Sequence, residues 1–174
     1  MAAPSLTAQL NAAEARAHAL DQDSSASRAV LLEAERSYER FRPDGEPAWL
    51  SFYTEAELAA DLGRALRDSG EPAHAILLMT RTVDSYEPWR VRSRCLAQTD
   101  LAAAYLLEGD YQHAAALARD ALNMAGKVSS SRTVHRIQSL QRQMRPLHSV
   151  DLAGLDEKII GFLRGAQDDE AITT

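Results

Sequence analysis

His74 and His113 are the residues whose type and spacing first suggest chemistry, because they stand 39 residues apart on neighbouring stretches of similar sequence. Two such imidazoles could bind zinc, which proteins usually hold with three or four ligands in tetrahedral geometry. The other three histidines are scattered along the chain, and no third ligand is expected near this pair. We therefore predict no metal site and interpret both histidines as solvated surface residues.

Cys95 is the only cysteine, and it could act as a nucleophile if a neighbouring base lowered its pKa. It lies in a strongly apolar stretch with nothing that marks it as activated, so we interpret it as a buried, inert thiol. The sequence also lacks a Gly-rich phosphate loop, a Gly-x-Ser-x-Gly elbow, a His-Glu-x-x-His helix and a calcium loop. We predict no catalytic residue, no cofactor and no enzymatic activity.

Charge and composition exclude further classes. The net charge of −6 repels phosphate, so the chain itself is not expected to bind nucleic acid or an anionic membrane. One cysteine excludes an internal disulfide and suits a reducing cytoplasm. No apolar run reaches the length that crosses a bilayer, and no secretion signal is visible. We expect a cytoplasmic chain that is rich in Ala and Leu and therefore helical throughout.

A period of 39 residues organises the sequence. Residues of one type recur at this spacing in two sets, which comprise Leu62, Leu101 and Leu140, and Ala75, Ala114 and Ala153. A fixed period in this range is typical of helical repeats, whose single units cannot bury their apolar faces alone. Turn signals and apolar spacing predict four antiparallel hairpins over about 5–41, 48–86, 88–125 and 131–164. They form one domain, 1–166, followed by a polar tail, 167–174.

Two details of this arrangement follow from spacing. The first helix carries an apolar stripe that we expect to be buried, made of Leu6, Leu10, Ala13, Ala17 and Leu20. Proline and glycine interrupt the chain over 42–47, and Trp49 follows this break. We interpret Trp49 mainly as a plug over the seam between the first two hairpins, with the wall of a ligand pocket as the alternative. The last helix is expected over about 150–163.

The repeat resembles the tetratricopeptide pattern. Leu62-Gly63, and more closely Leu101-Ala102 with Tyr105, match its Leu-Gly-x-x-Tyr segment, and Ala75 and Ala114 match its Ala-x-x-x-Phe segment. The period is 39 rather than the usual 34 and the leading Trp is missing. The resemblance implies an all-α fold, a right-handed tetratricopeptide-like α-solenoid, in which the small residues let paired helices approach closely.

A narrower resemblance covers nearly the whole chain. The order Pro47-x-Trp49-Leu50, then Asp100-Leu101-Ala102-x-Ala104-Tyr105, then Ser131-Arg132-x-Val134, resembles the C-terminal region of actinobacterial regulators that begin with a Cro/C1-type helix-turn-helix. In that family, helical repeats after the DNA-binding head are thought to sense a ligand or mediate self-association. The resemblance implies that the head is absent here, so that DNA would be bound only through such a missing segment.

Stacked hairpins line their concave side with their first helices, where a ligand would sit. Transfer of the repeat register predicts which side chains line this groove: Glu57, Asp61, Arg64, Thr99, Asp100, Ala103, His135, Ser139 and Arg142. Glu14 and His18 are weaker members of the same set. A polar groove with both signs of charge suits an extended peptide or a small polar effector. The alternative for each residue is an ordinary solvated helix face.

The resulting hypothesis is a non-enzymatic regulatory domain of a bacterial transcriptional regulator, which binds a peptide or small effector in its groove and for which dimerisation stays open. The alternative is a stand-alone tetratricopeptide adaptor that recruits a protein partner. No membrane is expected in either case.

Overall fold

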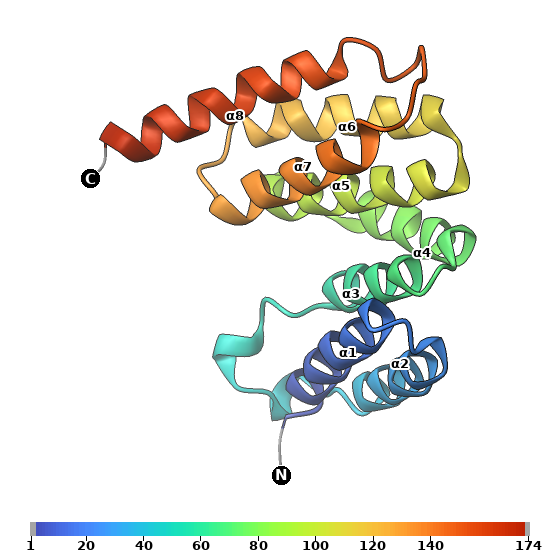
Figure 1. The fold of residues 1–174 in the computed structure, drawn as a ribbon. Helices are drawn as coiled ribbons and strands as arrows, with labels where there is room; N and C mark the ends of the chain where they lie inside the picture. The colour runs from blue at the N-terminus through green and yellow to red at the C-terminus, as the bar shows by residue number, and fades with distance from the viewer. Residues whose placement is uncertain (1–2, 173–174) are drawn as a thin grey trace. The chain divides into compact units, whose positions relative to one another are not determined.

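The computed structural model describes residues 3–172, with side chains described for 3–166, and its regular structure within this range is entirely helical. Figure 1 shows the helices in chain order. They are α1 (Pro4–Leu20), α2 (Ser24–Glu39), the short 3₁₀ turns η1 (Pro43–Gly45) and η2 (Ala48–Leu50), α3 (Glu55–Asp68), α4 (Pro72–Ser85), α5 (Val91–Glu108), α6 (Tyr111–Ala125), α7 (Ser131–Met144) and α8 (Leu155–Ile172). No helix of the described range is long and apolar enough to cross a lipid bilayer.

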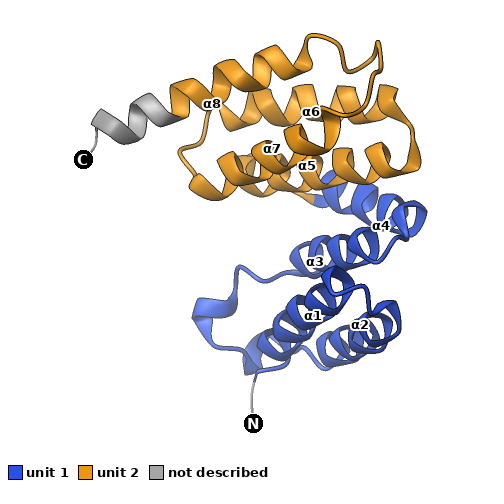
Figure 2. Cartoon of the chain, in the orientation of Figure 1, with its two compact units in different colours: residues 1–85 blue, residues 86–174 orange. Residues whose placement is uncertain are grey.

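The chain divides into two compact units, residues 1–85 and 86–174 (Figure 2). In unit 1, α1 packs along α2 and against α3, and α3 packs along α4. In unit 2, α5 packs along α6 and against α7, and α7 packs against α8. Each unit therefore holds two of the four expected helix pairs, and the first helices of its two pairs lie in contact.

Local sequence explains where several helices begin and end. Gly109 closes α5 with φ of 84°, a left-handed conformation that glycine adopts without steric cost. The carboxylate of Asp110 then accepts a hydrogen bond from the His113 amide and caps α6. The carboxylate of Asp23 caps α2 in the same way, through the Ala26 amide. These short turns hold consecutive helices side by side.

Small residues set the spacing between paired helices. A Cβ atom added to Gly63 on α3 would lie 2.6 Å from the Cγ of Met79 on α4, so any larger residue there would force the Met79 side chain to shift. Most of the expected repeat positions are buried, namely Leu62, Gly63, Ala75, Leu101, Ala102, Ala114 and Leu140, and Tyr105 is half-buried. Within each unit, paired helices therefore pack closely over small side chains at corresponding positions.

Three expectations about buried positions are wrong. Ala153 is exposed in the turn before α8, while its neighbour Leu152 is buried. Trp49 is 63 % exposed and covers no seam, because the adjacent Leu50 points inward instead. In both cases the adjacent residue is the buried one, so the expectation is off by one residue at a place where the chain turns.

The third error concerns α1. Its buried face consists of Ser5 and four alanines, Ala8, Ala12, Ala15 and Ala19, whereas Leu10, Ala13, Ala17 and Leu20 are exposed and Leu6 is half-buried. Helical spacing allows either stripe to face inward. The alanine stripe is the one buried because α1 contacts both α2 and α3 closely, and leucines would not fit.

The C-terminal boundary also differs from expectation. The last helix begins at Leu155 rather than near residue 150, because 146–154 forms a run of turns with Gly154 at φ of 73°. Its backbone continues to Ile172. The polar tail expected at 167–174 falls among residues whose side chains lie outside those described.

Candidate functional site

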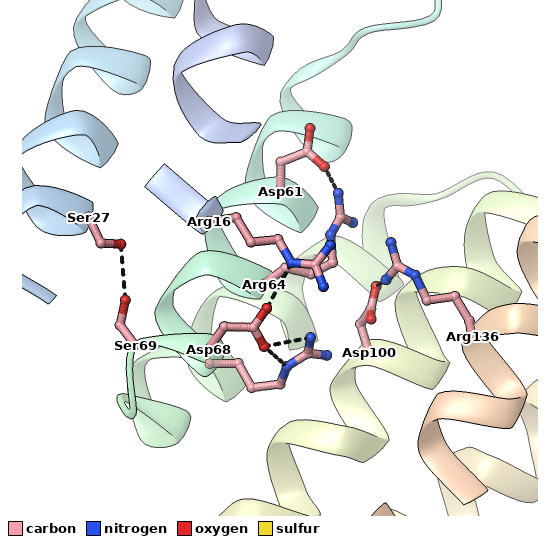
Figure 3. Close-up of polar contacts among 9 residues, drawn as sticks. Arg16, Ser27, Asp61, Arg64, Asp68, Ser69, Asp100 and Arg136 are labelled. Carbon is pink, nitrogen blue, oxygen red and sulfur yellow. Dashed lines mark hydrogen bonds and ion pairs between the residues drawn. The ribbon is translucent and has the colours of Figure 1, made fainter. Parts of the chain in front are cut away.

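The polar face of α3 carries the first three expected groove residues. Glu57, Asp61 and Arg64 are spaced by four and three residues, so they lie along one side of the helix. All three are half-buried. Asp61 forms an ion pair with Arg64 (Figure 3). It also accepts a hydrogen bond of 3.1 Å from the Tyr53 hydroxyl. The two charged groups expected to meet a ligand therefore pair with each other.

A second ionic group, which the sequence analysis missed, links α1 to α3. Arg16 Nε donates a hydrogen bond of 2.7 Å to Asp68 Oδ2, and Arg67 Nε donates one of 2.8 Å to Asp68 Oδ1 (Figure 3). Asp68 continues the polar face of α3 by one turn beyond Arg64. No local pattern marks this contact, because Arg16 and Asp68 are 52 residues apart in sequence.

The expected groove residues on α5 are not at an open surface. Thr99, Asp100 and Ala103 are all buried, which corrects the prediction. Thr99 donates a hydrogen bond of 2.7 Å to the Cys95 carbonyl, and Ala103 belongs to the apolar core of unit 2. Asp100 forms an ion pair with Arg136, which ties α5 to α7 (Figure 3). These residues stabilise contacts within the chain.

The expected groove residues on α7 keep an open position. His135 and Arg142 are exposed and Ser139 is half-buried, and their spacing of four and three residues places them on one face of the helix. The opposite side of α7, with Ile137, Leu140 and Met144, enters the core. Of the nine expected groove residues, the structure therefore leaves two surface sets, one on α3 in unit 1 and one on α7 in unit 2.

The connection between α7 and α8 lines an open hollow of about 400 Å³. It is lined by Met144, Arg145, Leu147, His148, Ser149, Val150, Leu152, Ala153, Gly154 and Asp156. Asp156 accepts hydrogen bonds from Gln141 at 2.6 Å and from Arg145 at 3.3 Å, so its charge is already balanced. None of the expected groove residues lines this hollow.

Cys95 and the two equivalent histidines occupy local structural roles. The Cys95 thiol is buried, donates to the Ala121 carbonyl, and has its pKa raised to about 11 by burial. His74 pairs with Glu71 at 3.0 Å, and His113 pairs with Asp110 at 2.7 Å. Among the described residues, no group of three His, Cys, Asp or Glu side chains could hold a metal ion.

Comparison with protein-family models, with curated proteins and with solved structures finds no match to this chain.

Proposed function

We propose that this chain is a non-enzymatic, tetratricopeptide-like binding domain that serves a bacterial transcriptional regulator in the cytoplasm. In this proposal it binds a peptide or a small polar effector along the first helices of its hairpins. The observation that carries the proposal is the pairing common to both units, in which the first helices of two consecutive pairs lie in contact, α1 with α3 and α5 with α7.

The polar face of α3 is the part of the proposed site with the most suitable chemistry. Asp61 and Arg64 are each less than one-fifth exposed and offer one charge of either sign at the edge of the surface. A zwitterionic or peptide ligand could exchange its own carboxylate and ammonium groups for this ion pair at little cost in lost charge pairing. The exposed set on α7, His135 and Arg142 with Ser139, offers a second polar strip of similar length.

A protein adaptor is the second candidate, and one observation favours it. Leu10 and Leu20 are both exposed by more than half on α1, and Ala13 and Ala17 lie exposed between them. An apolar stripe of this kind on a helix surface is typical of protein contacts rather than of small-molecule sites.

The two candidates are separated by one pair of measurements on the full chain. Thermal-shift screening against peptides and polar metabolites should find a stabilising ligand whose effect falls in Arg64→Ala. Arg36→Ala is the control, since Arg36 pairs with Glu33 at the same three-residue spacing on α2, where both side chains are more than half exposed. A ligand that stabilises wild type and both variants equally would exclude the α3 face.

Light scattering supplies the second measurement. A chain that stays strictly monomeric, and that no peptide or metabolite stabilises, contradicts the regulator proposal. Loss of a pulled-down protein partner upon Leu10→Glu and Leu20→Glu, with the α3 face intact, supports the adaptor.

A further inference from the structure

An aromatic cluster joins the end of α2 to the segment before α3, and none of the proposed binding residues belongs to it. The rings of Tyr38 and Phe41 stack with centroids 5.2 Å apart and planes 1° from parallel. Tyr53 meets Tyr38 edge-on at 6.4 Å and Phe52 at 6.3 Å. Tyr53 is buried in the core of unit 1, so it fixes the other rings to the unit.

Trp49 lies on the same segment as Phe52 and Tyr53. The amides of Leu50, Ser51 and Tyr53 each bond to the carbonyl three residues before them, so residues 47–53 turn in a 3₁₀ manner. Side chains three residues apart eclipse in a 3₁₀ turn, and Trp49 and Phe52 have this spacing at the end of η2. Trp49 is 63 % and Phe52 49 % exposed, while Leu50 is buried. Two large aromatic faces are therefore presented to solvent by an anchored segment.

The segment is also held at its start. Glu46 accepts hydrogen bonds from the Ser5 amide at 3.1 Å and from the Ser5 hydroxyl at 2.6 Å. Figure 1 shows this segment running outside the helices of unit 1 between α2 and α3. Because Glu46, Leu50 and Tyr53 tie it to the unit, the exposed rings are pre-organised, and little conformational entropy would be lost on binding.

The surroundings of the rings are acidic. Residues 39–57 contain five acidic side chains and two arginines, Arg40 and Arg42, so this stretch carries a net negative charge. Burial, followed by the charges of Glu55 and Glu46, raises the pKa of Tyr38. A surface that combines aromatic faces with carboxylates attracts cations through ring quadrupole and charge together.

We propose that Trp49 and Phe52, with Glu55 three residues further along at the start of α3, form a docking surface for an arginine-bearing segment of another protein. The planar guanidinium stacks on an aromatic face and pairs with a carboxylate at the same time, which lysine does less well. An anionic membrane is disfavoured because its charge has the same sign as the surface. A second copy bound about a two-fold axis would bring this acidic surface against itself, so it is disfavoured too.

The experiment uses the two tryptophans of the chain. Trp89, 72 % exposed in the turn before α5, is replaced in W89F so that fluorescence reports on Trp49 alone. The probe is a capped seven-residue peptide with two arginines, compared with its lysine and glutamate analogues. We expect the arginine peptide to change Trp49 fluorescence, the lysine peptide to bind about threefold more weakly, and the glutamate peptide not to bind.

Affinities by calorimetry then locate the surface. Trp49→Ala should weaken arginine-peptide binding about tenfold and Glu55→Gln about threefold, while Trp89→Ala should leave it unchanged. Circular dichroism checks that each variant stays folded. The proposal is overturned if the arginine peptide fails to bind, if the glutamate peptide binds equally well, or if Trp49→Ala binds like wild type. It is also overturned if the wild-type chain forms a dimer that Trp49→Ala dissociates.

Discussion

The two units use the same order of helix contacts but hold their first helices together differently. In unit 1, α1 and α3 are joined by a charged group that is partly open to water, since the Arg16 side chain is 37 % exposed. In unit 2, α5 and α7 are joined by Arg136 and an Asp100 side chain that is only 5 % exposed. One arrangement of helices therefore tolerates both a hydrated and a desolvated ionic link.

The apolar cores are both rich in alanine. The core of unit 1 combines alanines of α1, α2 and α3 with Leu31, Tyr53, Leu58 and Leu62. The core of unit 2 adds large aliphatic side chains from its last two helices, including Ile137, Leu155 and Ile159. The apolar area that these side chains bury can offset the cost of burying a charge pair.

The largest expected effect is that of a cation in a small-residue contact. Ala114→Arg in unit 2 should cost about 4 kcal/mol or more, because it buries an unpaired charge where a methyl group fits. Ala75→Arg should act likewise in unit 1. Ala116→Arg, at an exposed position of the same α6, should stay within about 0.5 kcal/mol of wild type. Urea denaturation measures all three, and equal midpoints for Ala114→Arg and Ala116→Arg would contradict the packing.

The two ionic links should respond unequally to loss of the carboxylate charge. Asp100→Asn leaves Arg136 partly buried without its counter-ion and should cost about 3 kcal/mol. Asp68→Asn should cost about 1.5 kcal/mol, since Arg16 can turn toward water and the Asn oxygen can still accept the hydrogen bond from the buried Arg67. Chemical denaturation of both variants gives the comparison. A larger loss for Asp68→Asn would reverse the distinction drawn between the units.

Glycines in two helices should respond oppositely to a larger side chain, because Gly63 on α3 is crowded by α4 and Gly161 on α8 is not. Gly63→Val should cost about 2 kcal/mol, because its side chain overlaps Met79. Adding Met79→Ala should make the double variant more stable than the sum of the single losses by about 1 kcal/mol. Gly161→Ala, with open space around its Cβ position, should gain about 0.5 kcal/mol from helix propensity. Thermal denaturation of the four variants tests these signs.

The smallest expected effect is on the stability of the fold at acid pH. Arg28, with a further contribution from His74, donates hydrogen bonds to Glu71 and holds the pKa of that carboxyl below its ordinary value of 4.5. The stability from this group is present above pH 4.5 and is lost as pH falls through the lower folded pKa. Glu71→Gln should remove about 0.5 kcal/mol at pH 7 and flatten this part of the acid profile. An unchanged profile below pH 4.5 would show that the pair contributes nothing.

The sequence predicted the helices well and their faces less well. Turn chemistry such as Gly109-Asp110 acts locally, so most helices begin and end within a few residues of expectation. The face that a helix buries depends on its neighbours. On α1 the leucine and alanine stripes were equally periodic, and only contact with both α2 and α3 selects the alanines.

The candidate site shows the same limit. Register correctly placed Glu57, Asp61 and Arg64 on one side of α3, because that relation lies within a single helix. It could not foresee that Asp100 would be paired with Arg136 and buried, since this pairing joins helices 36 residues apart in sequence. Arg16 and Asp68 were missed for the same reason.

Glu46 has a wider consequence for the start of the chain. Ala3 precedes α1 without a capping side chain, and the amide of Ser5 is satisfied by a carboxylate that lies 41 residues later. The hydrogen bond at the first turn of α1 therefore depends on the position of the segment that carries Trp49. A molecule that lifts this segment would release the Ser5 amide to solvent, so hydrogen exchange at this one amide would report displacement of the segment.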